Sequence, residues 1–231
     1  MRTNVSRIST VAAIMLPVWV CATVLAQHGT EPTKPAPKPA AQPATQPAPK
    51  PMAAAGTGAQ IGKPAPEFAL KDTTGKEVKL SSFKGKVVVL EWINHECPVV
   101  NRVYGANVTA NTIAKFKGQP VQWIGIDSSN FAEEKKANIT KWATDKKIDF
   151  PILLDAAGTV GKQFGAKTTP HMFVIDKEGI LAYAGAIDNN PDGSKKDGVR
   201  NYVEEAVSAL LKGSTVATAT TDPYGCSVKY K

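Results

Sequence analysis

The sequence has 231 residues, of which 42% are hydrophobic, and it carries a net charge of +8. This length accommodates one ordinary domain with additional segments. The basic residues do not form runs interleaved with aromatic residues, so the charge gives no indication of a nucleic-acid partner. The three cysteines include no C-x-x-C pair and no zinc-finger spacing, which excludes a disulfide-rich or zinc-finger module.

Residues 1–26 have the organisation of a secretory signal peptide. Arg2 and Arg7 precede an apolar run that Pro17 interrupts, and Val24-Leu25-Ala26 resembles a small-residue cleavage site. The run is too short and too poorly flanked for a membrane span. We therefore expect export, with a periplasmic or extracellular location after cleavage. The alternative is an uncleaved anchor, which would then be the only contact with a membrane.

Residues 27–59 are predicted to be a disordered linker rich in Pro, Ala and Lys. Such a composition favours extended polyproline II structure and acts as a semi-rigid spacer. The linker leads into a domain over residues 60–231, which contains Cys97 and Cys226. Export would place these two thiols in a compartment where disulfides persist.

The first half of the domain begins with two short predicted strands, one in each of the segments 61–72 and 75–86. The near-continuous apolar run VVVLEWI (87–93) predicts a strand that is buried on both faces of a helix-covered sheet. Pro98 suits the first position of a helix. The apolar spacing that follows predicts one helix from Pro98 to its close at Lys117-Gly118.

The second half continues the alternation of strands and helices. The predicted elements are strands at 121–129 and 151–155, a helix over 131–147 that starts with a capping-box pattern at Asn130 and Glu133, a short helix at 157–165, a hairpin of 171–176 with 180–187, and a final amphipathic helix whose apolar stripe runs from Val199 and ends before Gly213. This order predicts an α/β fold, with a mixed central sheet flanked by helices and an N-terminal pair of short strands.

Cys97 lies between the predicted buried strand and the predicted helix at Pro98. Unpaired N–H groups and the helix dipole favour a negative charge at such a position and lower the pKa of a thiol there. The polar neighbours Asn94, His95 and Glu96 argue against burial. We therefore interpret Cys97 as a reactive thiolate whose properties Asn94, His95 and Pro98 tune.

Thr168-Thr169-Pro170 stands directly before the strand at 171–176. Proline is the residue that readily takes a cis peptide bond, and a cis bond after Thr169 would expose its backbone for pairing with an extended thiol substrate. An ordinary trans proline at the start of an edge strand is equally compatible with the sequence.

From residue 61 to 231 the chain resembles the thioredoxin-fold redoxins of the alkyl hydroperoxide reductase/thiol-specific antioxidant superfamily. The resemblance lies in IGKPAPEFALKD, GKEVKLSSFKGKVVVLEW, the cysteine after that strand, and TTPHMFVIDKEGILAYAG. NHECP, IDNNP (187–191) and the tail PYGCSVKYK (223–231) are similar to the peroxiredoxin-like branch of that superfamily. The resemblance implies a thioredoxin fold in which Pro170 is the cis proline that faces the Cys97 helix.

The chain also departs from the patterns of these families. Val100 stands where thioredoxins have their second cysteine, and Leu90 and Asn94 replace the proline and the hydroxyl residue of the peroxiredoxin motif. Asn94 could still donate a hydrogen bond to a peroxide. Arg102, one turn into the helix, could supply positive charge or be a solvated surface residue.

Cys226 has three possible roles in this sequence. It could resolve a sulfenic acid or a mixed disulfide on Cys97, form a static disulfide with Cys97, or have no link to Cys97. Sequence alone does not give disulfide connectivity.

We interpret the chain as an exported thiol-dependent oxidoreductase that performs either thiol–disulfide exchange or peroxide reduction. Cys97 would be the nucleophile, Cys226 the possible resolving thiol, and Thr169 and Pro170 the substrate loop. The expected partners are a protein thiol or disulfide, or a peroxide, together with an external thiol reductant; no cofactor is expected. The alternative is an exported copper- or zinc-binding module with His95, Cys97 and His171 as ligands.

Overall fold

The computed structural model describes residues 58–231. The predicted signal peptide and almost all of the predicted linker therefore lie outside the described residues. Within residues 58–231, no helix is long and apolar enough to cross a membrane.

The centre of the domain is a seven-stranded mixed sheet with the order β2-β1-β5-β4-β3-β7-β8. Its strands are β1 (Ala69–Asp72), β2 (Glu77–Lys79), β3 (Val87–Trp92), β4 (Val121–Asp127), β5 (Ile152–Leu154), β7 (His171–Ile175) and β8 (Leu181–Gly185). β3 pairs parallel with β4 and antiparallel with β7. The predicted short N-terminal strands and the predicted hairpin are confirmed as the antiparallel pairs β1–β2 and β7–β8.

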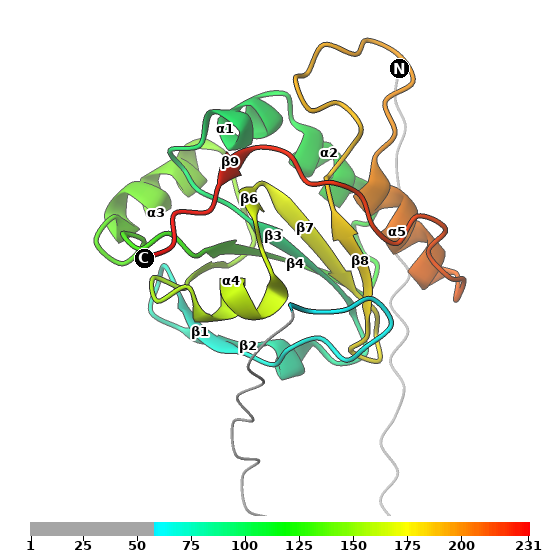
Figure 1. The fold of residues 1–231 in the computed structure, drawn as a ribbon, viewed down its shortest axis with the longest axis horizontal. Coiled ribbons are helices and arrows are strands. Elements are labelled where there is room, and N and C mark those ends of the chain that lie inside the picture. The colour runs from blue at the N-terminus through cyan, green and yellow to red at the C-terminus, as the bar shows by residue number, and fades with distance from the viewer. Residues whose placement is uncertain (1–57) are drawn as a thin grey trace, which may run out of the picture. The chain divides into compact units, whose positions relative to one another are not determined.

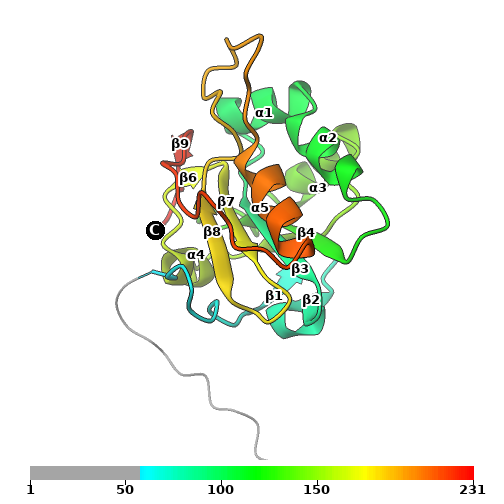
Figure 2. The same cartoon turned by 90° about the vertical axis from the view of Figure 1, so that its right-hand side faces the viewer.

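All six residues of β3 are buried, as the apolar run predicts. Val88, Leu90 and Trp92 face the side of the sheet that is covered by α4 (Thr159–Phe164). Val87 and Val89 face the opposite side. That side is covered by α1 (Pro98–Gly105), α2 (Val108–Lys115), α3 (Lys136–Asp145) and α5 (Tyr202–Leu211). Figures 1 and 2 show these helices on the opposite side of the sheet from α4. This arrangement is the predicted thioredoxin fold.

The single helix predicted from Pro98 is wrong, because the chain forms two helices, α1 and α2. Asn107 between them has a φ of 57°, in the left-handed region that a continuing helix cannot use. The Asn107 N–H donates to the Tyr104 carbonyl instead of to the residue four positions earlier. The side-chain periodicity is the same on both sides of the break, so the apolar pattern does not reveal it.

The predicted helix over 131–147 is shorter at its N-terminal end, and the predicted capping box does not form. α3 begins at Lys136 after a series of turns. In a capping box, the backbone N–H of the N-cap residue donates to the side chain of the residue three positions later. Here the Asn130 N–H instead donates to the Lys229 carbonyl of the C-terminal segment at 2.8 Å. The Asn130 N–H is therefore occupied by the C-terminal segment and is not available to the Glu133 side chain.

The final helix also starts later than its apolar stripe predicts. α5 begins at Tyr202, and the Asn201 side chain caps it by accepting from the Glu204 N–H. Val199 lies before the helix and is 44% exposed, so it is not part of the core. Two further elements complete the fold, the 3-10 turn η1 (Leu80–Phe83) and a separate small sheet of β6 (Thr168–Thr169) and β9 (Cys226–Ser227).

Candidate active site

The loop between β3 and α1 is held in place by the side chain of Asn94. Asn94 is buried, and its Nδ2 donates to Ser129 Oγ at 3.0 Å, at the end of the neighbouring strand β4. Its Oδ1 accepts from the Glu96 N–H at 2.7 Å, and its carbonyl accepts from the Cys97 N–H at 3.0 Å. Asn94 therefore fixes the backbone that presents Cys97.

Asn101 attaches the first turn of α1 to the same loop. Its Nδ2 donates to the carbonyls of His95 and Cys97 at 2.8 and 3.1 Å. Its Oδ1 accepts from Trp142 Nε1 of α3 at 2.8 Å. The sequence analysis did not identify Asn101 or Trp142, because only the fold brings their chain segments together.

Cys97 is the N-cap residue of α1, with Pro98 in the first turn. The expectation that polar neighbours keep it exposed is wrong, because Cys97 is only 3% exposed. Its thiol donates to the Thr169 carbonyl at 3.1 Å, next to the Thr169–Pro170 bond, which is cis as the resemblance implied. The burial comes from this loop and from the C-terminal segment, both distant in sequence.

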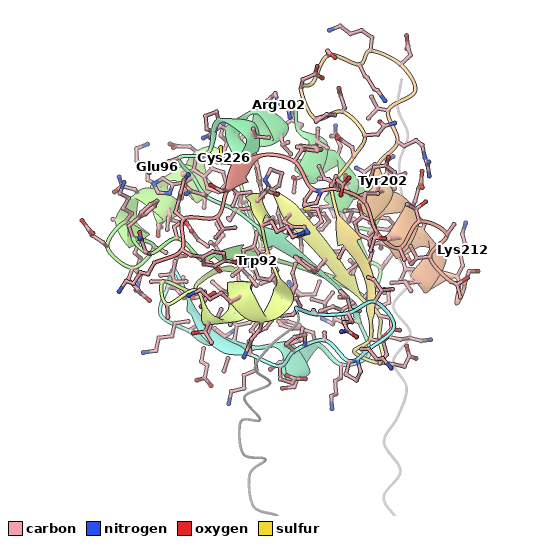
Figure 3. The ribbon with its side chains drawn as sticks, viewed as in Figure 1. Trp92, Glu96, Arg102, Tyr202, Lys212 and Cys226 are labelled. Carbon is pink, nitrogen blue, oxygen red and sulfur yellow. The ribbon has the colours of Figure 1, made fainter. Side chains whose placement is uncertain are left out.

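Cys226 lies directly over Cys97. The two residues are 129 positions apart in sequence, and their Sγ atoms are 2.9 Å apart. Both are free thiols in the structure, and a disulfide would require about 2.05 Å. Figure 3 shows Cys226 on the C-terminal segment next to α1, the helix that carries Arg102.

The C-terminal segment reaches this place by strand pairing. β9 pairs antiparallel with β6, which places Cys226 opposite Thr169 and Ser227 opposite Thr168. Gly225 approaches so closely that a Cβ on it would lie 2.1 Å from the Thr169 carbonyl oxygen, and its φ is 128°. Only glycine satisfies both conditions, so the Gly-Cys sequence is required by the approach of the tail.

The two thiols have opposite shifts in pKa. Burial raises the pKa of Cys97, but hydrogen bonding from the Cys226 thiol and the Thr169 side chain outweighs it. The backbone N–H groups of Val100 and Cys226 act in the same direction, so the pKa of Cys97 lies below its ordinary value. Burial and the neighbouring Cys97 sulfur raise the pKa of Cys226. Cys97 is therefore the more acidic thiol of the pair.

The Thr169 hydroxyl is available for that interaction. Thr169 is 2% exposed, and its Oγ1 has no hydrogen-bond partner among the described residues. An unpaired buried hydroxyl is costly unless it meets a charge or an acceptor. A thiolate on Cys97 would provide one.

His95 precedes Cys97 by two residues, and within residues 58–231 its side chain makes no hydrogen bond to either sulfur. Burial lowers its pKa, and Lys135 adds to this effect while Glu96 opposes it. Its Nδ1 is buried and finds no hydrogen-bond partner within the described part of the chain. The Glu96 carboxylate pairs with Lys135 of the segment before α3.

His171 does not join His95 and Cys97 in a ligand set. Its Nδ1 accepts from the Lys167 N–H at 3.2 Å, and its ring stacks on Phe173 with centroids 4.4 Å apart. Burial lowers its pKa to about 4. Within residues 58–231, no group of three or more His, Cys, Asp or Glu side chains could hold a metal ion. The three residues of the metal-binding alternative therefore do not form a site.

Arg102 contacts the loop at Pro191 and the C-terminal segment at Tyr224, so it is not simply a solvated arginine. Its Nη2 donates to the Pro191 carbonyl, and its guanidinium lies 5.9 Å from the centre of the Tyr224 ring. Tyr224 OH in turn donates to Asp188 Oδ1 at 2.6 Å. These contacts hold the tail two residues before Cys226.

Glu91 is a buried titratable group that the sequence analysis missed. It is fully buried in β3, and its carboxylate accepts from Trp123 Nε1 at 2.8 Å and Tyr104 OH at 3.0 Å. Burial raises its pKa to about 7. In the sequence, Glu91 could have been noticed as the single carboxylate within the apolar run 87–93.

The sequence comparisons place this chain in a known family. The AhpC/TSA family model matches residues 61–184, and the chain belongs to that family. The thiol-disulfide oxidoreductase ResA of Bacillus thuringiensis subsp. konkukian is 31% identical over 127 residues, which are 52% of this chain and 66% of that protein. The chloroplastic peroxiredoxin Q of Triticum aestivum is 34% identical over 143 residues, which are 56% of this chain and 63% of that protein.

A solved structure agrees over a larger part of the chain. The crystal structure of a hypothetical protein from Sinorhizobium meliloti 1021 matches with a TM-score of 0.68 and 30% identity, covering 76% of this chain and 97% of that one. The chain is thus similar in sequence to a protein named a thiol-disulfide oxidoreductase and to one named a peroxiredoxin. The matched region spans slightly less than two thirds of the length of each of these two relatives.

Proposed function

We propose that this chain is a thiol-dependent oxidoreductase in which Cys97 is the nucleophile and Cys226 the resolving thiol. The observation that carries the proposal is the 2.9 Å separation of two sulfurs that are 129 residues apart. The contact between the two sulfurs depends on the pairing of β9 with β6, which places Cys226 opposite Thr169. The names of the ResA and peroxiredoxin Q relatives support a redox function for this arrangement.

The shifts in pKa support this division of roles between Cys97 and Cys226. The thiolate is the nucleophile in thiol chemistry, and Cys97 has the lowered pKa. Cys226 has the raised pKa, so its thiol is the one that can donate a hydrogen bond once the Cys97 thiol is deprotonated. The first attack therefore comes from Cys97.

Both candidate reactions lead to the same disulfide. With a hydroperoxide, the Cys97 thiolate attacks the terminal oxygen, the O–O bond breaks, and the products are a Cys97 sulfenic acid and an alcohol or water. Cys226 then attacks the Cys97 sulfur and water leaves. With a disulfide, Cys97 forms a mixed disulfide and releases one thiol, and Cys226 displaces the second. An external thiol reductant then restores both cysteines.

Export is part of the proposal and rests on the sequence. Residues 1–26 would act as a signal peptide and residues 27–59 as a spacer that carries the redox domain outside the cytoplasm. In such a compartment a thiol cycle needs a dedicated reductant, because disulfides persist there.

The test uses the full chain in a Cys21→Ser background, where Cys97 and Cys226 are the remaining thiols. Turnover of hydrogen peroxide or a small disulfide is measured with an excess of dithiothreitol. Cys97→Ser should abolish turnover. Cys226→Ser should still undergo the first oxidation, which mass spectrometry would detect as a dimedone adduct or a mixed disulfide on Cys97. Ser227→Ala is the matched control at the neighbouring, exposed position of the same strand.

Wild-type turnover in Cys97→Ser would contradict the proposal. Equal turnover in Cys226→Ser and the control would retain Cys97 as the nucleophile but remove Cys226 from the cycle.

A further inference from the structure

The C-terminal residues 225–230, here called the docked tail, lie along the site as an extended chain. β9 pairs with β6, the Val228 N–H donates to the Lys167 carbonyl at 3.0 Å, and the Lys229 carbonyl accepts from the Asn130 N–H at 2.8 Å. Figure 1 shows this red segment crossing from the side of α1 and β6 towards α3. The docked tail thus makes backbone contacts well beyond Cys226.

Tyr230 anchors the end of the docked tail, four residues after Cys226. Its hydroxyl donates to the Ala166 carbonyl at 2.9 Å. Its ring occupies space left by two glycines, since a Cβ on Gly158 or Gly161 would lie 2.6 or 2.5 Å from Tyr230 atoms. Val228 between the anchor and Cys226 is buried in the core. The side chains as well as the backbone therefore hold the tail down.

The docked tail covers the part of the site that a polypeptide would need. An incoming extended chain binds a sheet edge through main-chain hydrogen bonds. At Thr168 and Thr169 that edge is already paired with the tail. Cys97 beneath it is 3% exposed.

Two openings of different extent would admit two kinds of oxidant. A small oxidant needs only a rotation of the Cys226 side chain, while β9 stays paired and Tyr230 stays in its place. A polypeptide disulfide needs the whole of β9 to leave the Thr168–Thr169 edge. The second opening must break the Val228 and Tyr230 contacts, and the first does not.

We propose that Tyr230 is a specificity-determining residue that restricts Cys97 to small oxidants of the hydroperoxide class by keeping the tail docked. The inference rests on the proposed function and assigns its substrate class. In the favoured reaction the O–O bond breaks, an S–O bond forms on Cys97, and the alcohol or water leaves. Cys226 then forms the S–S bond from within the docked tail and releases water.

The experiment compares two rate constants in the full chain. The pre-reduced protein is mixed with hydrogen peroxide or with insulin as a polypeptide disulfide, and the oxidation of Cys97 is followed by quenched mass spectrometry. Tyr230→Ala should raise the ratio of the insulin rate to the peroxide rate at least about tenfold, because it removes a hydrogen bond and a packed ring. Tyr230→Phe, which keeps the ring, should give a smaller increase. Lys231→Ala is the control at the adjacent exposed position and should leave the ratio unchanged.

A second variant guards against simple misfolding of Tyr230→Ala. Gly161→Ala keeps Tyr230 but places a Cβ 2.5 Å from its hydroxyl oxygen and 2.7 Å from Ser128 Oγ. It should therefore displace the anchor and raise the same ratio. An unchanged ratio in both variants would overturn the inference, and so would an equal rise in both rates. A wild-type protein that reacts as fast with insulin as Tyr230→Ala would overturn it while leaving Cys97 as the nucleophile. No reaction of any variant with either oxidant would overturn the proposed function as well.

Discussion

Replacing Glu91 by Gln should remove a specific part of the pH dependence of stability. Glu91 is fully buried, and three side chains, those of Tyr104, Thr109 and Trp123, hydrogen bond to its carboxylate. Gln has a similar shape and is uncharged throughout the relevant range of pH. The change therefore tests the titration of Glu91 with little change in packing.

The magnitude follows from the pKa of Glu91, which rises from an ordinary 4.5 to about 7 in the folded protein. Between these values the folded state holds a proton that the unfolded state has released, so the free energy of unfolding falls as pH rises. At about 1.36 kcal/mol per pKa unit, the contribution is roughly 3 kcal/mol. It is fully present below pH 4.5 and is lost as pH passes through about 7.

The assay is urea denaturation at pH 4.5 and at pH 8 with a phosphine reductant, for the wild type and Glu91→Gln. The wild type should lose roughly 3 kcal/mol more than the variant between the two values of pH. Asp127, whose pKa burial raises to about 6, titrates with the same sign but is present in both proteins and cancels. Equal changes in the two proteins would refute the assigned titration of Glu91.

Three further predictions concern the thiols, the tail and the core. The rate of alkylation of Cys97 should rise with pH around a midpoint below the ordinary thiol pKa. Cys226→Ala should move this midpoint upwards, because it removes a side-chain donor to the Cys97 thiolate. Unchanged midpoints in mass-resolved labelling would contradict this. Gly225→Ala should slow formation of the intramolecular disulfide by about tenfold or more, because the added Cβ clashes with the Thr169 carbonyl on the opposite strand. The control Gly105→Ala, whose Cβ meets no atom of another segment within 4 Å, should not slow it. Non-reducing peptide mapping over time would measure both rates. Phe164→Ala should cost about 3–5 kcal/mol in urea denaturation, since the ring is 2% exposed in the core, and a loss under 1 kcal/mol would contradict its assigned packing.

The sequence determined the parts of this protein whose signals are local. The apolar run at 87–93 specified a strand buried on both faces, because continuous hydrophobicity in a short segment has that solution in a helix-covered sheet. Pro98 after Cys97 marked a helix start, and the polar turn after Ile175 marked the hairpin. The resemblance to a redoxin family implied the cis bond before Pro170, which the residues alone left open.

The tertiary structure alone decided the burial of Cys97 and its contact with Cys226. Polar neighbours suggested exposure, but burial depends on what covers a residue, and here the cover is a loop and a tail distant in sequence. The same tail takes the backbone N–H that a capping box at Asn130 needs, so α3 starts later than its local motif predicts. Contacts between distant segments leave no periodic pattern in either segment, and the candidate active site of this protein is made of such contacts.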